Sequence, residues 1–336
     1  MAKRRPKGVL GLGWACLESA ASGRTEHVRT SDDYPDSVVR RTTFTAGGGL
    51  GWKISALVTP RDKPTSLKIV VIPGAPCWAE YWAPVLAALP LDREMIVVDR
   101  PGFAASEPAT CVPDIRLQAA ALAPLLEAAP GQKILLVGQS YGAAIATVMA
   151  AQNPKALAGV VLLSSFLGEP GPTARWLVNL GMRVLTMIPR DLRHAIVEVS
   201  SQAAQLDHMK TALRRLNVPV HVIHGDADDF APIELAEALV KETRTRTPMN
   251  FIRVPGANHF LNDGPVELLL NCLERCIPAP VAAFKLPALP RAPCVARPHR
   301  LVRPQAGRAG RRAQRIANRN NRSSQGIVPA MTESRG

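Results

Sequence analysis

The sequence predicts an α/β fold whose mostly parallel sheet is covered by helices on both faces. Short, continuous apolar runs recur along the chain with segments of helical periodicity between them, which is typical of buried parallel strands joined by helices. One strand-to-helix boundary, at 138–142, has the pattern G-x-S-x-G. A connection of about fifty residues, at 164–217, interrupts the alternation and predicts an inserted substructure.

The strands are predicted in chain order. Two early strands, at 38–45 and 52–59, are joined by a turn at Gly47, Gly48 and Gly49. Six further strands are predicted at apolar runs of four to six residues, 69–72, 95–98, 134–137, 160–163, 218–223 and 251–254. The last packed helix is expected at 265–277, so the folded domain is predicted to span 38–278.

The long connection contains Pro170, Pro172 and Pro189 and helical stretches at 176–188 and 191–216. A single crossover helix does not need that length. We expect a small helical cap at about 166–216 that covers the ends of the strands, with a long surface excursion as the alternative.

Charge is concentrated at the two ends of the chain. Twelve Lys or Arg and one acid fall within 279–336, and four Lys or Arg fall within 1–7, so residues 8–278 carry a net charge of −1 out of +14 overall. The tail at 279–336 is rich in Pro, Arg, Ala and Gly without periodicity, and we expect it to be disordered. It is a candidate contact for nucleic acid or an anionic membrane, although arginines without interleaved aromatics do not favour base stacking.

The N-terminal arm at 1–37 has a basic start followed by a short apolar run at 8–16. This run is too short to span a membrane, and a weak signal or membrane tether is the alternative to an ordinary arm. We expect a cytoplasmic protein, with export or tethering as the alternative.

The six cysteines form no C-x-x-C pair. Cys272 and Cys276 are spaced i, i+4 on the last predicted helix, but no further Cys or His stands at a suitable spacing for a metal. We interpret the thiols as small buried hydrophobic groups. No metal, cofactor or disulfide framework is expected.

Ser140 stands between Gly138 and Gly142 in the turn at 138–142. A tight turn of this kind leaves no room for side chains at its flanks and exposes the serine hydroxyl above a helix N-terminus, as in a nucleophile elbow. A serine that only caps the helix is the alternative.

A serine nucleophile needs a base, and the base needs an orienting acid. His259 lies in a loop between the last predicted strand and the last helix. Asp226, Asp228 and Asp229 follow the preceding strand, and each is a candidate acid. The chain order Ser, Asp, His matches one known arrangement of a catalytic triad. The alternative is that all three acids are solvated loop residues.

Four other histidines are predicted to have roles outside the triad. His221 and His224 flank a strand and are interpreted as structural. His194 and His208 fall in the cap region and are expected to be solvated, with a substrate contact as the alternative.

The loop after the strand at 69–72 contains Gly74. A glycine there lets a backbone N–H, that of Ala75, point toward a developing oxyanion, and the amide of Tyr141 supplies the second donor. An ordinary Pro-Gly turn is the alternative.

Together these motifs resemble the α/β-hydrolase superfamily over residues 38–278. The family pattern H-G-x-P, followed by Trp, aligns with 73–76 and Trp82, and D-x-P-G-x-G-x-S aligns with 99–106. The pattern G-x-x-D-x-x-x-P aligns with Gly225, Asp228 and Pro232, and this resemblance selects Asp228 as the acid. The histidine pattern G-x-G-H aligns with 256–259.

Three positions depart from the family patterns. Pro73 stands for the usual His, so the hydrogen bonds of that imidazole are missing, and Ala104 and Asn258 each stand for a Gly. None of these changes removes a catalytic group. Serine at 140 argues against the dehalogenase and epoxide-hydrolase branches, which use Asp as the nucleophile.

The resemblance implies a serine hydrolase that cleaves a carboxylic ester or related acyl bond of a small-to-medium apolar substrate. Lactones, amides and carbon–carbon bonds are alternatives on the same triad, and a binding protein with little turnover is an alternative of another class. Four apolar side chains are predicted to contact the substrate, although cap packing would also explain such residues: Trp78, Trp176, Leu180 and Phe260.

Overall fold

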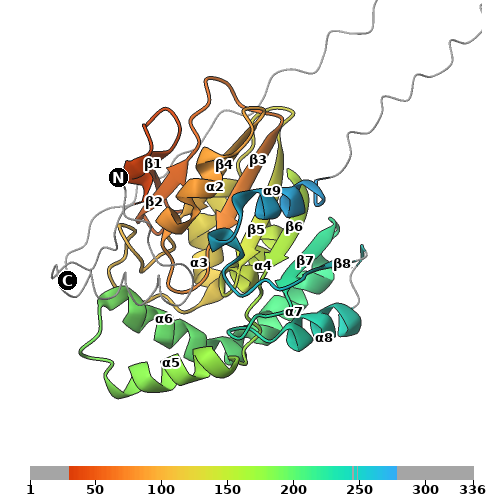
Figure 1. Ribbon diagram of the computed structural model, residues 1–336. Coiled ribbons are helices and arrows are strands. Elements are labelled where there is room, and N and C mark those ends of the chain that lie inside the picture. The colour runs from red at the N-terminus through yellow and green to blue at the C-terminus, as the bar shows by residue number, and fades with distance from the viewer. Residues whose placement is uncertain (1–29, 244–245, 248, 278–336) are drawn as a thin grey trace, which may run out of the picture. The chain divides into compact units, whose positions relative to one another are not determined.

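The computed structural model describes residues 30–243, 246–247 and 249–277. They form one eight-stranded sheet in the order β1-β2-β4-β3-β5-β6-β7-β8 (Figure 1). The first two pairings, β1 with β2 and β2 with β4, are antiparallel, and all the others are parallel. The predicted mostly parallel α/β sheet is confirmed.

Each predicted strand is present, with ends that differ by a few residues. The strands are β1 (Arg40–Thr45), β2 (Lys53–Val58), β3 (Leu67–Ile72), β4 (Arg93–Val98), β5 (Lys133–Gln139), β6 (Leu157–Leu163), β7 (Val220–Gly225) and β8 (Met249–Val254). β5 extends two residues beyond the predicted run and therefore ends immediately before Ser140.

Helices cover both faces of the sheet. The helices are α2 (Ala83–Ala87), α3 (Ile115–Leu122), α4 (Gly142–Gln152), α5 (Pro172–Arg183), α6 (Arg190–Ser201), α7 (Leu206–Arg215), α8 (Ile233–Glu242) and α9 (Val266–Glu274), with 3-10 turns at Ser31–Asp33, Ala79–Trp82, Ala123–Leu126, Gln202–Gln205 and Leu261–Asp263. Buried side chains of α3, α4, α7 and α8 share one apolar core, and those of α2 and α9 share the other.

The central strand β5 shows how the two cores arise. Ile134 and Leu136 point into the core beneath α4, whereas Leu135 and Val137 point into the core beneath α9. Successive strand side chains alternate between the two faces of the sheet. Because helices cover both faces, polar side chains are disfavoured at all positions and not only at every second one. This is why the strand is a continuous apolar run.

The long connection between β6 and β7 forms three helices and not one continuous cap. α5 and α6 lie together beyond one end of the sheet (Figure 1). α7, which the sequence assigned to the cap at 166–216, instead buries Met209 and Leu213 in the core beside α4. α7 therefore belongs to the layer of helices that covers the sheet. Only α5 and α6 lie outside that layer, and we call these two helices the cap.

Described cysteines are mostly buried thiols. Cys77, Cys272 and Cys276 are buried, and burial raises the pKa of Cys276 to about 12. Among the residues described, no cluster of three or more metal-binding side chains occurs, and no helix has the length and hydropathy to cross a bilayer. The predictions for residues 1–29 of the arm and for the tail at 279–336 lie outside the described residues.

Candidate active site

Ser140 occupies a strained turn between β5 and α4. Its φ is +51°, a left-handed conformation that non-glycine residues rarely adopt. The turn is held because the Ser140 N–H donates to the carbonyl of Leu163 on β6 (2.8 Å) and the Ser140 carbonyl accepts from Ala143 (3.1 Å). Strain of this kind persists only when the surroundings impose it, and it is common at functional sites.

The glycines on either side of Ser140 are required by their neighbours. A Cβ at Gly138 would lie 2.6 Å from the Cα of Ala143, and one at Gly142 would lie 2.1 Å from the carbonyl oxygen of Ile72. Both neighbours are backbone atoms, which cannot turn aside. The steric reason for the G-x-S-x-G spacing is therefore visible in the structure.

His259 links Ser140 to Asp228. Its Nε2 lies 3.0 Å from the Ser140 hydroxyl and its Nδ1 lies 2.8 Å from Oδ2 of Asp228. A carboxylate can only accept, so Nδ1 carries a hydrogen and Nε2 presents its lone pair to the serine. The structure brings together these three residues, which lie at the ends of β5, β7 and β8.

The carboxylate of Asp228 is surrounded by donors. Its Oδ1 accepts from the amides of Phe230 (2.9 Å) and Ala231 (2.8 Å). Burial raises the pKa of Asp228, but hydrogen bonds from His224, His259 and the backbone outweigh burial and hold the pKa below its usual range. The other two candidate acids make different contacts: Asp226 accepts from the Gly256 amide, and Asp229 accepts from the Thr173 hydroxyl.

His224 is a second histidine on the same carboxylate. Its Nε2 lies 3.1 Å from Oδ2 of Asp228 and 2.9 Å from the carbonyl of Ala231, and its side chain is fully buried. Both neighbours are acceptors, so Nε2 carries a hydrogen. Sequence reasoning classed His224 as merely structural; its position four residues before Asp228 was the available signal.

Two phenylalanines enclose the imidazole of His259. The Phe230 ring stacks on it at 5.4 Å between centroids, and the Phe260 ring meets it edge-on at 5.3 Å. Only 6% of His259 is exposed. These rings exclude water from the face of the imidazole and limit its rotation.

The loop after β3 approaches Ser140 closely. A Cβ at Gly74 would lie 2.7 Å from the Cβ of Ser140, so only glycine allows this approach. Ala75 lines the cavity beside it. The hydrogen bonds of the described residues include none donated by the N–H of Ala75 or of Tyr141. Ala75 lines the cavity, whereas Tyr141 is fully buried and is not among its lining residues.

Ser140 and His259 lie in a cavity of about 360 Å³ between the strand ends and the cap. Its walls are largely apolar, and cap residues such as Leu177, Ile188 and Val199 supply one side. Neither Lys nor Arg is among the lining residues that the structure describes. The cavity therefore suits an uncharged, apolar molecule of modest size.

Three of the four predicted substrate contacts line the cavity, and one does not. Trp78, Leu180 and Phe260 line the cavity. Trp176 does not line it, and 63% of its surface is exposed on α5. The helical periodicity of α5 explains this, because Leu177 and Val178 face inward and leave Trp176 on the outer side.

Two cap residues anchor α6 to the main domain, and the sequence did not single them out. Asp191 accepts from Nε1 of Trp78 (2.7 Å) and from the amide of Ala104 (2.9 Å). Glu198 forms an ion pair with Arg100 in which both side chains are fully buried. The expectation that His194 is solvated is wrong: it is buried, and its Nδ1 lies 2.7 Å from the Gly102 carbonyl.

Comparison with known proteins agrees with this architecture. A family model described as the alpha/beta hydrolase fold matches residues 69–214. The chain has the α/β-hydrolase fold. The match includes the loop after β3, the turn at Ser140 and both cap helices, whereas the loops of Asp228 and His259 follow it.

Individual proteins to which this chain is similar act on different bonds, according to their names. A 2-hydroxy-6-oxononadienedioate/2-hydroxy-6-oxononatrienedioate hydrolase from Dechloromonas aromatica is 30% identical over 99 residues, which are 29% of this chain and only 34% of that protein. A thermophilic esterase from Thermogutta terrifontis is similar in structure, with a TM-score of 0.54, 21% identity, and coverage of 71% of this chain and 99% of the other.

A third relative is the 2-hydroxy-6-oxo-6-phenylhexa-2,4-dienoate hydrolase from Rhodococcus sp. strain RHA1. Its structure matches with a TM-score of 0.55 and 19% identity, covering 71% of this chain and 98% of the other. At such identities the structural likeness establishes the fold alone. The choice of bond must therefore come from the site itself.

Proposed function

We propose that this protein is a serine esterase that cleaves a carboxylic ester of an uncharged, small-to-medium apolar acid. The observation that carries the proposal is the continuous contact from Ser140 through His259 to Asp228, with 3.0 and 2.8 Å between the bonded atoms. A serine alcohol becomes a competent nucleophile when a base so placed can take its proton.

The proposed reaction begins with attack of the Ser140 Oγ on the ester carbonyl carbon as its proton passes to Nε2 of His259. The N–H groups of Ala75 and Tyr141 stabilise the oxyanion, and one such donor is typically worth roughly 3–4 kcal/mol. His259 then gives its proton to the leaving alcohol, which leaves an acyl group on Ser140. Water attacks the acyl-enzyme, gives a proton to His259 and releases the acid, and the proton returns to Ser140.

Asp228 acts on the imidazole of His259 and not on the substrate. Its carboxylate holds Nδ1 and stabilises the positive charge that His259 gains during each proton transfer. Four donors around this carboxylate, two amides and two imidazoles, favour its ionised form. The carboxylate of Asp228 therefore remains ionised while His259 carries its positive charge.

A carbon–carbon hydrolase is the second candidate, because two relatives are named as hydrolases of dienoates. A substrate with carboxylate groups would have to bring its negative charge into the cavity. Binding an anion in an apolar site requires a cation or several aligned donors, and neither Lys nor Arg lines the described cavity. The lining therefore favours the neutral ester.

The test is hydrolysis of p-nitrophenyl esters of increasing acyl length by the wild type and by Ser140→Ala. We expect turnover by the wild type, its loss in the variant, and an unchanged far-UV circular dichroism spectrum. A fluorophosphonate probe should label the wild type and not Ser140→Ala. Equal turnover by the two proteins would refute Ser140 as the nucleophile, and tight ester binding without turnover would point to a binding protein.

A further inference from the structure

Arg100 is a buried cation at the centre of the molecule. It follows β4, is fully buried, and lies beneath the loop that carries Gly74 and Ala75. Its guanidinium makes five hydrogen bonds, to the carbonyls of Pro73 and Gly74, to Gln118 and to both carboxylate oxygens of Glu198. A guanidinium has five N–H donors in a rigid plane, so no donor is left without an acceptor.

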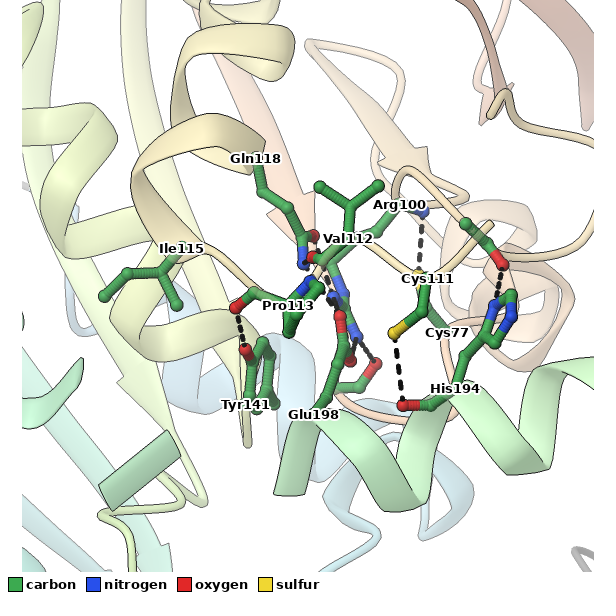
Figure 2. Close-up of polar contacts among 12 residues, drawn as sticks. Cys77, Arg100, Cys111, Val112, Pro113, Ile115, Gln118, Tyr141, His194 and Glu198 are labelled. Carbon is green, nitrogen blue, oxygen red and sulfur yellow. Dashed lines mark hydrogen bonds and ion pairs between the residues drawn. The ribbon is translucent and has the colours of Figure 1, made fainter. Parts of the chain in front are cut away.

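The partners of Arg100 come from three separate elements. Figure 2 shows Gln118 of α3, Arg100 and Glu198 of α6 turned toward one another. Gln118 also donates to Glu198 (2.7 Å) and to the carbonyl of Val112 (2.6 Å). Burial disfavours the charged form of Arg100, but the carboxylate of Glu198 raises the pKa of Arg100 above its usual range. The charge is therefore permanent.

One of these hydrogen bonds bears directly on the site. The carbonyl of Gly74 and the N–H of Ala75 belong to the same planar peptide group and point in opposite directions. Nη2 of Arg100 donates to that carbonyl at 2.8 Å, and Nε donates to the carbonyl of Pro73 at 2.9 Å. Fixing the two carbonyls fixes the direction of the Ala75 N–H, and a charged donor on the carbonyl polarises the peptide and strengthens that N–H.

Arg100 also lies against the side chain of Tyr141, whose backbone N–H is the second proposed oxyanion donor. Its guanidinium carbon lies 5.1 Å from the ring centroid of Tyr141 and 4.8 Å from that of Phe103. The Tyr141 hydroxyl is fixed in turn by the Pro113 carbonyl at 2.7 Å, as drawn in Figure 2. One cation therefore contacts both segments that would present amides to the oxyanion.

We propose that Arg100 and Glu198 are positioning residues that couple the cap helix α6 to the oxyanion-binding amides. This inference rests on the proposed function, because it assigns a purpose to the amides of Ala75 and Tyr141. Glu198 neutralises the buried cation and holds it in place only when α6 is docked, so displacement of the cap loosens the loop.

The main test compares Glu198→Gln with the wild type. Glutamine keeps the shape and removes the charge, so the clamp on the loop weakens while the cavity keeps its lining. We expect kcat for a p-nitrophenyl ester to fall roughly 10- to 100-fold with KM almost unchanged, below the 10²- to 10³-fold typical of a lost oxyanion donor. The backbone amide resonance of Ala75 should move in the ¹H–¹⁵N spectrum.

Two further variants make the outcome decisive. His194→Gln is the matched control, because His194 is buried on the same helix and its ring hydrogen-bonds to the Gly102 carbonyl and not to Arg100 or Glu198. It should leave both kcat and the Ala75 amide resonance in place. If Glu198→Gln does not fold, Arg100→Met combined with Glu198→Met replaces the buried pair by apolar side chains, which folded proteins often tolerate, and should show the same loss of kcat.

The inference is wrong if the folded variants keep wild-type kcat and an unshifted Ala75 amide, or if His194→Gln changes both as much. A wild type that hydrolyses no ester would refute the proposed function instead. The Ala75 amide shift would then still show whether Arg100 and Glu198 hold the loop, so the two failures are distinguishable.

Discussion

The two sides of the cavity differ in what surrounds each side chain. At the strand ends, an added Cβ at Gly142 would meet a backbone oxygen, that of Ile72, at 2.1 Å. In the cap, an added Cβ at Gly181 of α5 would meet the Cδ1 of Ile196 at 2.2 Å, the far end of a flexible side chain. The turn that carries Ser140 is thus held by backbone, whereas the cap side of the cavity is lined by adaptable side chains.

The two sides of the cavity also differ in their exposure to solvent. Strands β5 and β7 are buried along almost their whole length, while α5 exposes Trp176, Leu180 and Met182. Groups held by buried backbone keep one geometry, and a half-exposed helix pair can adjust to different acyl groups. We therefore expect changes at the strand ends to act on kcat and stability, and changes in the cap to act on KM.

The largest expected effect is that of Asp228→Asn. The amide cannot stabilise a charged His259 and can reverse its tautomer, so kcat should fall about 10³- to 10⁴-fold with little change in KM. Steady-state kinetics at neutral pH measure this, with Asp229→Asn as the matched control on the same loop. A loss of less than tenfold would show that the strand-end geometry is not catalytic.

The same variant should change how stability depends on pH. The pKa of Asp228 is lower in the folded chain than the value of about 3.9 expected when unfolded. Its ionised form therefore stabilises the fold above that pH, and this stabilisation is lost as pH falls toward the folded-state pKa. The Tm difference between wild type and Asp228→Asn should be largest near neutral pH and shrink below about pH 4; a constant difference would contradict it.

A pair of glycine substitutions compares the two regions directly. Alanine normally stabilises a helix relative to glycine by about 1 kcal/mol, but Gly142→Ala should destabilise the protein by roughly 3 kcal/mol because a backbone carbonyl must move. Gly181→Ala should cost much less, because the Ile196 side chain can change rotamer. Urea unfolding of both variants tests this, and equal losses would show that the cap is as rigid as the strand ends.

Asp191→Asn should weaken the docking of the cap. Asp191 is fully buried and accepts hydrogen bonds from Trp78, which lines the cavity, and from the Ala104 amide. Both of these bonds end on one carboxylate oxygen, and the other oxygen accepts from Nε of Arg190 (2.8 Å). The amino group of asparagine must therefore face a donor on one side or the other, at a cost of about 1–3 kcal/mol. We expect KM to rise several-fold and Tm to fall while kcat changes little. A fall in kcat alone would mean that this anchor supports the chemistry.

The smallest effect is expected for Trp176→Ala. Its side chain is exposed and does not line the cavity, so kcat, KM and stability should stay within about 0.5 kcal/mol of the wild type. Leu180→Ala is the informative partner, because Leu180 does line the cavity. It should raise KM for longer acyl chains only. Equal effects of both variants would show that the two faces of α5 are not distinct.

The sequence predicted local features best. Eight strands, the turn at 138–142 and the loops of Asp228 and His259 were found because tight turns and continuous apolar runs impose a pattern on neighbouring residues. The assignment of α7 to the cap was wrong because an amphipathic helix does not reveal which apolar surface it will cover. Met209 and Leu213 would suit a cap or a core equally well.

Contacts between distant residues could not be read from the sequence. His224 and Asp228 are four residues apart, yet their contact depends on how the chain turns after β7. Arg100 and Glu198 are 98 positions apart. Nothing in the D-x-P-G motif distinguishes a buried arginine from a surface one, because the burial of Arg100 depends on three elements that meet only in the folded protein.

The sheet, the order of the three candidate catalytic residues and the need for glycine beside Ser140 follow from the amino-acid sequence, because each depends on local sterics or on the alternation of apolar side chains. In contrast, the packing of distant elements sets which cations are buried, which face of α5 lines the cavity and what holds the loop of Ala75. Burial and ion pairing depend on the elements that meet in space, and a buried charge such as Arg100 is stable only when all its partners arrive together.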